Sequence, residues 1–100
     1  MHQHYQLNFT VAPAIEGSVV DWLLQFAGPD GFTSFPVYGH SSVHEGMSLF
    51  EEVVGRKKQI RFQVQVTATQ LPQLLERLRS EFAGAGLHYW VVPVIETGYI

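Results

Sequence analysis

The chain contains no cysteine, few charged residues and no long apolar run. The absence of cysteine excludes disulfide scaffolds, thiolate metal sites and cysteine nucleophiles. No apolar stretch approaches the ~18 residues that span a bilayer, and residues 1–5 lack the basic and apolar segments of a signal peptide. We therefore expect a cytoplasmic protein with no membrane insertion.

Charged residues make up 15% of the 100 residues, below the ~25% usual for soluble proteins. The net charge of −3 argues against nucleic acid as a partner, because phosphate binding needs a basic surface. The length predicts one domain over residues 1–100 with its own core. A small domain with so few charges favours an oligomer that covers part of its surface. The alternative is a monomer with a surface rich in glutamine and serine.

Hydrophobic periodicity predicts six elements in the order β-α-β-β-α-β. Alternation predicts strands at 5–11, 32–39 and 59–67, and an apolar run predicts a fourth at 87–95. Apolar spacings of three and four predict one helix between Ala14 and Phe26 and another that ends before Gly84, with Thr69 as its cap. This order is typical of the ferredoxin-like α+β fold, a four-stranded antiparallel sheet with two helices on one face.

Prolines and polar residues indicate how the strands are placed in the sheet. Pro36 and Pro93 each remove a backbone donor, so the strand of Pro36 should lie at an edge or carry a bulge, and Pro93 should mark an edge or the end of its strand. The apolar residues of the two central strands should face the helices, which leaves a row of uncharged polar residues on the other face. With the aromatic residues expected there, that face comprises Asn8, Thr10, Gln63, Gln65, Tyr38 and either Tyr89 or Trp90. An exposed face usually carries more charge, so this pattern favours sheets that face one another in an oligomer.

The connection between the second and third strands concentrates the chemistry of the chain. Val37 to Arg61 holds two of the five histidines, three of the nine acidic residues and four of the six basic ones. It is longer than a hairpin turn, and long connections on a rigid sheet often carry function. A capping-box pattern and a following glycine predict an extra short helix from Leu49 to Val54.

His40 and His44 are four residues apart, and Glu45 is adjacent to His44. Imidazole and carboxylate ligands suit zinc, nickel, cobalt or copper(II), so these three residues form a candidate metal site. A further ligand can come from Glu51, Glu52, or His88 of another subunit. The alternative is a pair of solvated histidines that hydrogen-bond to the backbone.

Arg56, Lys57, Lys58 and Arg61 form a basic cluster in the sequence. The cluster can hold an anionic ligand or an acidic partner. It can equally be solvated, or pair with the neighbouring glutamates. We favour a structural role of this kind over a binding site, although exposed ion pairs contribute little to stability.

The segments 21–39 and 91–94 resemble the nitrogen-regulatory PII signalling proteins. The segments 39–42, 52–56 and 86–91 are similar to an uncharacterised PII-like subgroup, whose members are often found beside heavy-metal efflux pumps. This resemblance implies a homotrimer whose sheets line its centre, with ligands in clefts between subunits. It also implies a set of ligand-binding residues: Gly39, His40, Ser41, Ser42, Arg56 and His88.

The chain departs from the PII pattern at several of these positions. Ser41 replaces the glutamine that meets 2-oxoglutarate, His40 replaces an arginine, and His88 replaces a phosphate-binding lysine. The arginines expected near the C-terminus are missing from residues 96–100. These departures argue against ATP binding in the PII manner and leave the ligand open.

No zinc-protease motif, nucleophile elbow or P-loop is present, so we expect no enzymatic activity. The first hypothesis is a regulatory protein whose loop 39–55 responds to a small ligand or divalent metal and alters contact with a partner, such as a metal efflux system. A second is a trimer that binds divalent cations without a dedicated partner. A third is a small dimeric ferredoxin-like enzyme with a histidine such as His88 as its base.

Overall fold

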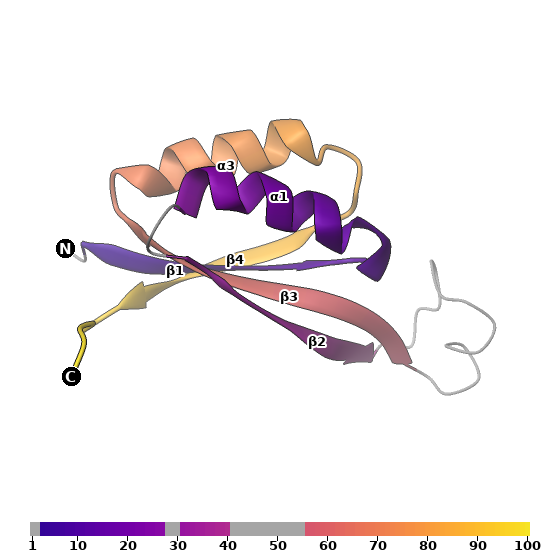
Figure 1. Ribbon diagram of the computed structural model, residues 1–100, viewed down its shortest axis with the longest axis horizontal. Coiled ribbons are helices and arrows are strands. Elements are labelled where there is room, and N and C mark those ends of the chain that lie inside the picture. The colour runs from indigo at the N-terminus through magenta and orange to yellow at the C-terminus, as the bar shows by residue number, and fades with distance from the viewer. Residues whose placement is uncertain (1–2, 28–30, 41–55) are drawn as a thin grey trace.

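The computed structural model describes residues 3–27, 31–40 and 56–100, which form a four-stranded sheet with two helices on one face (Figure 1). Along the chain the elements are β1 (His4–Val11), the 3-10 helix η1 (Pro13–Ile15), α1 (Glu16–Ala27), β2 (Thr33–His40), β3 (Arg56–Thr67), α3 (Gln70–Glu81) and β4 (His88–Val94). The strand order is β2-β3-β1-β4, and all neighbouring strands are antiparallel. The predicted ferredoxin-like α+β fold is confirmed.

The helices begin differently from the sequence expectation. The first helix is preceded by η1, which has a proline in its first turn, where the missing N–H has no helical partner to lose. The short helix predicted from Leu49 to Val54 lies outside the described residues. Within the described part of the chain, no helix is long and apolar enough to cross a membrane.

The two strands that contain proline are the edges of the sheet, as predicted. β2 holds Pro36 and pairs only with β3, and β4 holds Pro93 and pairs only with β1 within the described sheet. β3 begins at Arg56, three residues before the predicted start, because its pairing with β2 continues as far as His40. This longer ladder carries the candidate residues at the end of β2 on regular strand rather than on a loop.

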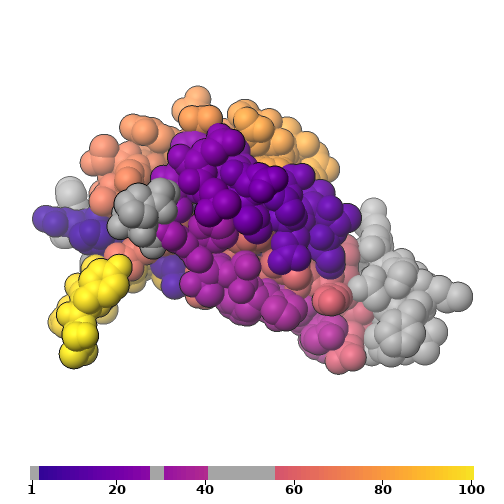
Figure 2. All heavy atoms as spheres, viewed as in Figure 1, coloured from indigo at the N-terminus to yellow at the C-terminus, as the bar shows by residue number. Residues whose placement is uncertain are grey.

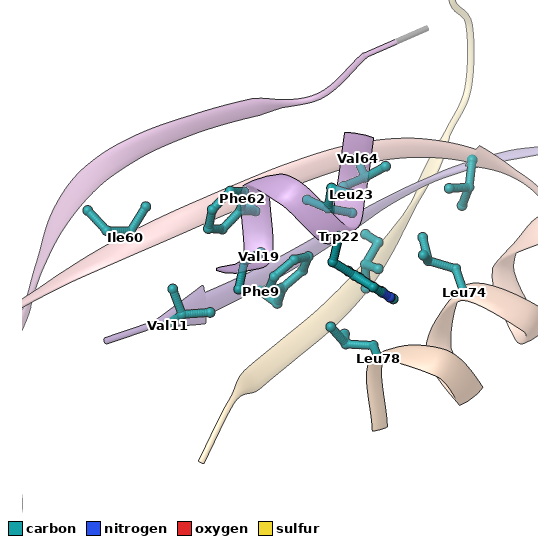
Figure 3. Packing of buried hydrophobic residues seen from close by; sticks show 12 residues of the cluster. Phe9, Val11, Val19, Trp22, Leu23, Ile60, Phe62, Val64, Leu74 and Leu78 are labelled. Atoms are coloured by element: carbon teal, nitrogen blue, oxygen red, sulfur yellow. The ribbon is translucent and has the colours of Figure 1, made fainter. Parts of the chain in front are cut away.

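The core lies between the sheet and the helices (Figure 3). Phe9 of β1 and Phe62 of β3 are directly opposed in register, and their rings stack with centroids 5.2 Å apart. Trp22 of α1 contacts Phe26 and Phe82, with centroids 5.0 and 5.5 Å away, so it joins the two helices. The twelve buried apolar residues are Leu7, Phe9, Val11, Val19, Trp22, Leu23, Ile60, Phe62, Val64, Val66, Leu74 and Leu78. The predicted apolar stripes of both helices are confirmed.

The register assigns each strand residue to one face, because directly opposed residues point to the same side of a sheet. We call the side away from the helices the open face. Asn8, Thr10, Gln63 and Gln65 belong to it, as predicted, and Trp90 joins them opposite Asn8. Tyr89, opposite Phe9, belongs to the helix side.

The prediction that Tyr38 lies on the open face is wrong. Tyr38 is opposed to Lys58, which shares the helix side with Ile60 and Phe62. The half-buried Phe35, opposed to Arg61, occupies the open face instead. Placing Tyr38 on the open face assumed that the apolar residues of β2 face the helices. The register with β3 places them on the open face instead. The open face is therefore apolar at its β2 edge.

The first turn of α3 is capped by a residue that the sequence analysis did not select. Thr69 already has helical dihedral angles and makes no capping hydrogen bond. The Gln70 backbone N–H donates to Thr67 Oγ1 over 3.1 Å, and the Thr67 N–H donates to Gln70 Oε1 over 3.0 Å. The two bonds form a reciprocal capping box of the Thr-x-x-Gln type. The pattern was visible in the sequence, with Thr67 two residues before the chosen Thr69.

Thr67→Ala is expected to lower the free energy of unfolding by about 1 kcal/mol, because it leaves an N–H of the first helical turn without its partner. Chemical denaturation measures this difference. Thr69→Ala is the matched control, since the Thr69 side chain makes no capping bond, and its effect should be within about 0.5 kcal/mol. An equal loss in both variants would contradict the assignment of the cap to Thr67.

Candidate functional site

Two polar residues are buried on the open face, although no helix covers it. Asn8 is 2% exposed and Thr10 is 5% exposed. Both lie on the central strand β1, so residues of β3 and β4 flank them on either side. Gln63 and Trp90 are the neighbours of Asn8. The central strip of the open face is thus uncharged and shielded by the long side chains beside it.

Thr10 lies within a group of four residues that we call the open-face cluster: Thr10, Arg61, His88 and Trp90. Arg61 of β3 and His88 of β4 are both directly opposite Thr10. The Trp90 ring centroid lies 4.9 Å from the Arg61 guanidinium carbon and 5.1 Å from the His88 ring. Because β1 separates β3 from β4, the Arg61 side chain reaches across β1 to stack on Trp90. Attraction between the cation and the indole face favours this position.

Two polar atoms of the cluster are buried and have no hydrogen-bond partner in the described part of the chain: Thr10 Oγ1 and Arg61 Nε. Such a group destabilises the folded state by about 1–3 kcal/mol, and native proteins usually satisfy it with protein, water or ligand. Alternation in the sequence identified the face but carried no signal for these unpaired atoms.

The charges of the sheet are all of one sign. None of the four strands contains Asp or Glu, whereas β3 carries four basic residues. The acidic residues of the described chain lie on the helices and the C-terminal tail: Glu16, Asp21, Glu76, Glu81 and Glu96. The basic cluster predicted from the sequence is split by the alternation of β3. Lys57 and Arg61 belong to the open face, and Arg56 and Lys58 to the helix side.

The end of the β2–β3 ladder holds three of the predicted ligand-binding residues. Gly39 is opposite Lys57, and His40 is opposite Arg56. A Cβ atom at Gly39 would come within 2.8 Å of Gln59 Oε1, so the glycine makes room for that amide. The Arg56 guanidinium lies 4.1 Å from the Tyr38 ring centroid. This contact holds the Arg56 side chain at the start of β3. Arg56 is one of the residues predicted to bind a ligand.

The structure places only one of the other predicted residues, His88. Ser41, Ser42, His44 and Glu45 lie outside the described residues. His88 begins β4, at the edge of the sheet opposite β2, so one chain does not place it beside His40. No group of three potential metal-ligating side chains occurs among residues 3–27, 31–40 and 56–100. The predicted metal site therefore remains a prediction.

A groove on the helix side was not indicated by the sequence. It is a cavity of about 420 Å³ between the end of α3, the turn that follows it and β4. Arg79 Nη2 donates a hydrogen bond of 2.9 Å to the Tyr89 hydroxyl at this groove. Gly84 and Gly86, with φ of 80° and 71°, shape the turn in a conformation that other residues rarely adopt.

The fold is shared with PII-like and CutA proteins. CPII from Thiomonas intermedia, a nitrogen regulatory PII-like protein solved with ADP, AMP and bicarbonate, matches with a TM-score of 0.69 and 19% identity, over 99% of this chain and 98% of that chain. CutA from Synechococcus elongatus matches with a TM-score of 0.71 and 16% identity, over 95% and 80%. At these identities the likeness shows the fold alone.

The family is narrower than the fold. A family model described as "Protein of unknown function (DUF3240)" matches residues 1–100, so the chain belongs to the DUF3240 family. A DUF3240 family protein from Shewanella baltica has a TM-score of 0.80 and 21% identity, over 100% of this chain and 99% of that one. No curated protein matches the sequence. The predicted membership of a PII-like family of unknown function is confirmed.

Proposed function

We propose that this chain is a PII-like regulatory protein without enzymatic activity, which acts as a homotrimer in the cytoplasm. It binds a small ligand in clefts between subunits and responds through residues 39–55, thereby changing its contact with a partner protein. The observation that carries the proposal is the end-to-end likeness to a PII-like protein solved with nucleotides and bicarbonate. Likeness of fold alone does not define an activity, so the rest of the support comes from the residues themselves.

The open face supports the trimer. Its central strand contributes only uncharged residues, and apolar residues lie at both edges, such as the half-buried Phe35 on β2 and Val92 on β4, which is 39% exposed. A sheet face of this composition gains free energy when another apolar surface covers it. The four strands also carry no acidic residue, so the open face has no ion pairs between strands that would need to stay hydrated.

The groove beside α3 supports a ligand site. Its walls include Leu75, Leu78 and Phe82, with the Arg79 guanidinium and the Tyr89 hydroxyl at its rim. Apolar walls with a few polar groups are typical of small-molecule sites. The groove also includes Gly84, Gly86 and Leu87 of the turn after α3.

A divalent metal is the second ligand that we propose, bound by His40 with His44 and Glu45. His40 ends β2 and is exposed, so its imidazole is accessible from solvent. Imidazole and carboxylate together suit zinc, nickel, cobalt and copper(II). With such a ligand, the partner that we propose is a component of a metal efflux system.

A simpler second function is a trimer that binds divalent cations without a dedicated partner. A protein from Ehrlichia chaffeensis described as a divalent ion tolerance protein shares the fold, with a TM-score of 0.71 over 98% of this chain and 87% of that chain. Affinity capture with the intact protein separates the two functions. Recovery of a membrane or regulatory protein favours the sensor, and recovery of the chain alone favours the simpler function.

Sedimentation and calorimetry test the proposal. At micromolar concentration the chain is expected to sediment with three times its mass of 11.3 kDa. Titration with zinc, nickel, cobalt and copper(II) is expected to give binding that a His40→Ala/His44→Ala double variant loses, and titration with ADP, AMP and bicarbonate tests the clefts. A lone particle of 11.3 kDa would overturn the trimer, and a dimer would favour the enzyme alternative. Equal weak binding by wild type and double variant would remove the metal site.

A further inference from the structure

We propose that the open-face cluster is a binding site for a small free oxyanion such as phosphate, sulfate or a carboxylate. The Arg61 guanidinium and the Thr10 hydroxyl hold the anion, and His88 borders it. This site is distinct from the groove beside α3, because the two lie on opposite sides of the sheet. It uses only the described residues, and it does not depend on the segment 41–55.

The first support is the pair of unpartnered polar atoms. Thr10 is 5% exposed, yet its hydroxyl has no hydrogen-bond partner in the described chain, and neither has Arg61 Nε. The two residues are directly opposite each other on β1 and β3. The hydroxyl and the guanidinium N–H are thus two unpartnered donors on neighbouring residues of the same sheet face. An oxyanion, which only accepts hydrogen bonds, satisfies both at once.

The second support is the position of the guanidinium. Its carbon lies over the Trp90 ring, 4.9 Å from the centroid. The Nε–H and a neighbouring Nη–H of a guanidinium form a planar fork, which matches the spacing of two oxygen atoms of a carboxylate or phosphate. Contact with Trp90 restricts the Arg61 side chain in advance, so less side-chain entropy is lost when an anion binds.

The third support is the missing countercharge. Within the described residues Arg61 makes no ion pair, and no strand of the sheet carries an acidic residue. Cations that are partly removed from water are normally paired or bound to an ion. Arg61 is half-buried beside the half-buried Trp90, so its attraction to an anion is stronger than on a fully exposed surface. A divalent cation is disfavoured here, because the positive charge of Arg61 repels it.

Anion binding can be measured from thermal unfolding in sodium phosphate against sodium chloride of equal ionic strength. Phosphate is expected to raise the unfolding midpoint of the wild type, and Arg61→Gln is expected to abolish that increase. Arg61→Lys keeps the charge but loses the fork, so the phosphate dissociation constant should rise about tenfold or more. Sulfate and acetate, tested in the same way, show whether a tetrahedral or a planar anion is preferred.

Arg77→Gln is the matched control. Arg77 is also stacked on an aromatic ring, with its guanidinium carbon 4.2 Å from the Phe26 centroid, but it lies on α3 on the other side of the sheet. This variant loses the same charge and should keep the whole phosphate effect. If phosphate acts no more strongly than chloride on the wild type, or acts equally on Arg61→Gln, the proposal is overturned.

Thr10→Val tests the hydroxyl separately. Valine has nearly the same shape, so in chloride the variant should be at least as stable as the wild type, because an unpaired buried hydroxyl has been removed. In phosphate its gain in midpoint should be smaller than that of the wild type. An undiminished gain would remove Thr10 from the site. Sedimentation of the same samples tests the proposed trimer separately. A variant that loses anion binding but keeps the mass of a trimer shows that the anion site fails while the assembly remains.

Discussion

Phe62→Ala is expected to lower the free energy of unfolding by about 3–5 kcal/mol, which is much of the stability of a domain of this size. Phe62 is fully buried in the middle of β3. Its ring stacks on Phe9 with centroids 5.2 Å apart and contacts Phe32 at 6.1 Å. Alanine removes the ring and leaves a cavity between the sheet and the helices (Figure 3), where close packing prevents full collapse.

Denaturant unfolding followed by tryptophan fluorescence measures this loss, because Trp22 lies in the same core. All variants must be compared at one protein concentration, since assembly contributes to the apparent stability. Tyr99→Ala is the control: Tyr99 is 100% exposed on the C-terminal tail, which projects from the body of the molecule (Figure 2). Its effect should stay within about 0.5 kcal/mol. A loss below about 1 kcal/mol for Phe62→Ala would show that the two rings do not pack as described.

Phe9 and Phe62 also illustrate why the fold could be predicted from the sequence. Each belongs to an alternating run in which apolar residues recur at every second position, and such a run has only one way to bury its apolar side. Pro36 and Pro93 then assigned the outer strands, because a central strand cannot lose a backbone donor. Element order and sheet order both follow from these local signals.

The error in the facing of β2 arose because its own apolar pattern and its pairing with β3 favour opposite orientations. In β2 the apolar residues Phe35 and Val37 were assumed to face the helices, but pairing with β3 turns them to the open face. An edge strand with residues of both kinds on each side has no strong preference of its own, so its register decides. The register is set by neighbouring strands, which a reading of β2 alone does not include.

The candidate site was predictable only in part. His88 was selected because it takes the place of a lysine in the PII resemblance, and its neighbours on the folded sheet were not considered. Arg61 was grouped with Arg56 because the two are close in sequence, whereas alternation sends them to opposite sides of the sheet. The open-face cluster joins residues 10, 61, 88 and 90, which come from three strands. Contacts of this kind depend on pairing between distant segments, and no local pattern reports them.

Val92→Glu is expected to convert the trimer into a monomer. Val92 lies on the open face of β4, opposite Gln6, and is 39% exposed in the single chain. A carboxylate there remains hydrated in the monomer, so the fold should persist. In an assembly that covers the open face, the same carboxylate loses its water, at a penalty of several kcal/mol per buried charge.

Sedimentation at micromolar concentration measures the change, from three times 11.3 kDa to 11.3 kDa, and circular dichroism checks that the sheet is retained. Leu24→Glu is the matched control, because Leu24 is 59% exposed on α1 and lies on the other side of the sheet. It introduces the same charge in place of a similar apolar side chain and should leave the trimer intact. If Val92→Glu remains trimeric while Leu24→Glu dissociates, subunits associate through the helices, and the open face must be assigned another role.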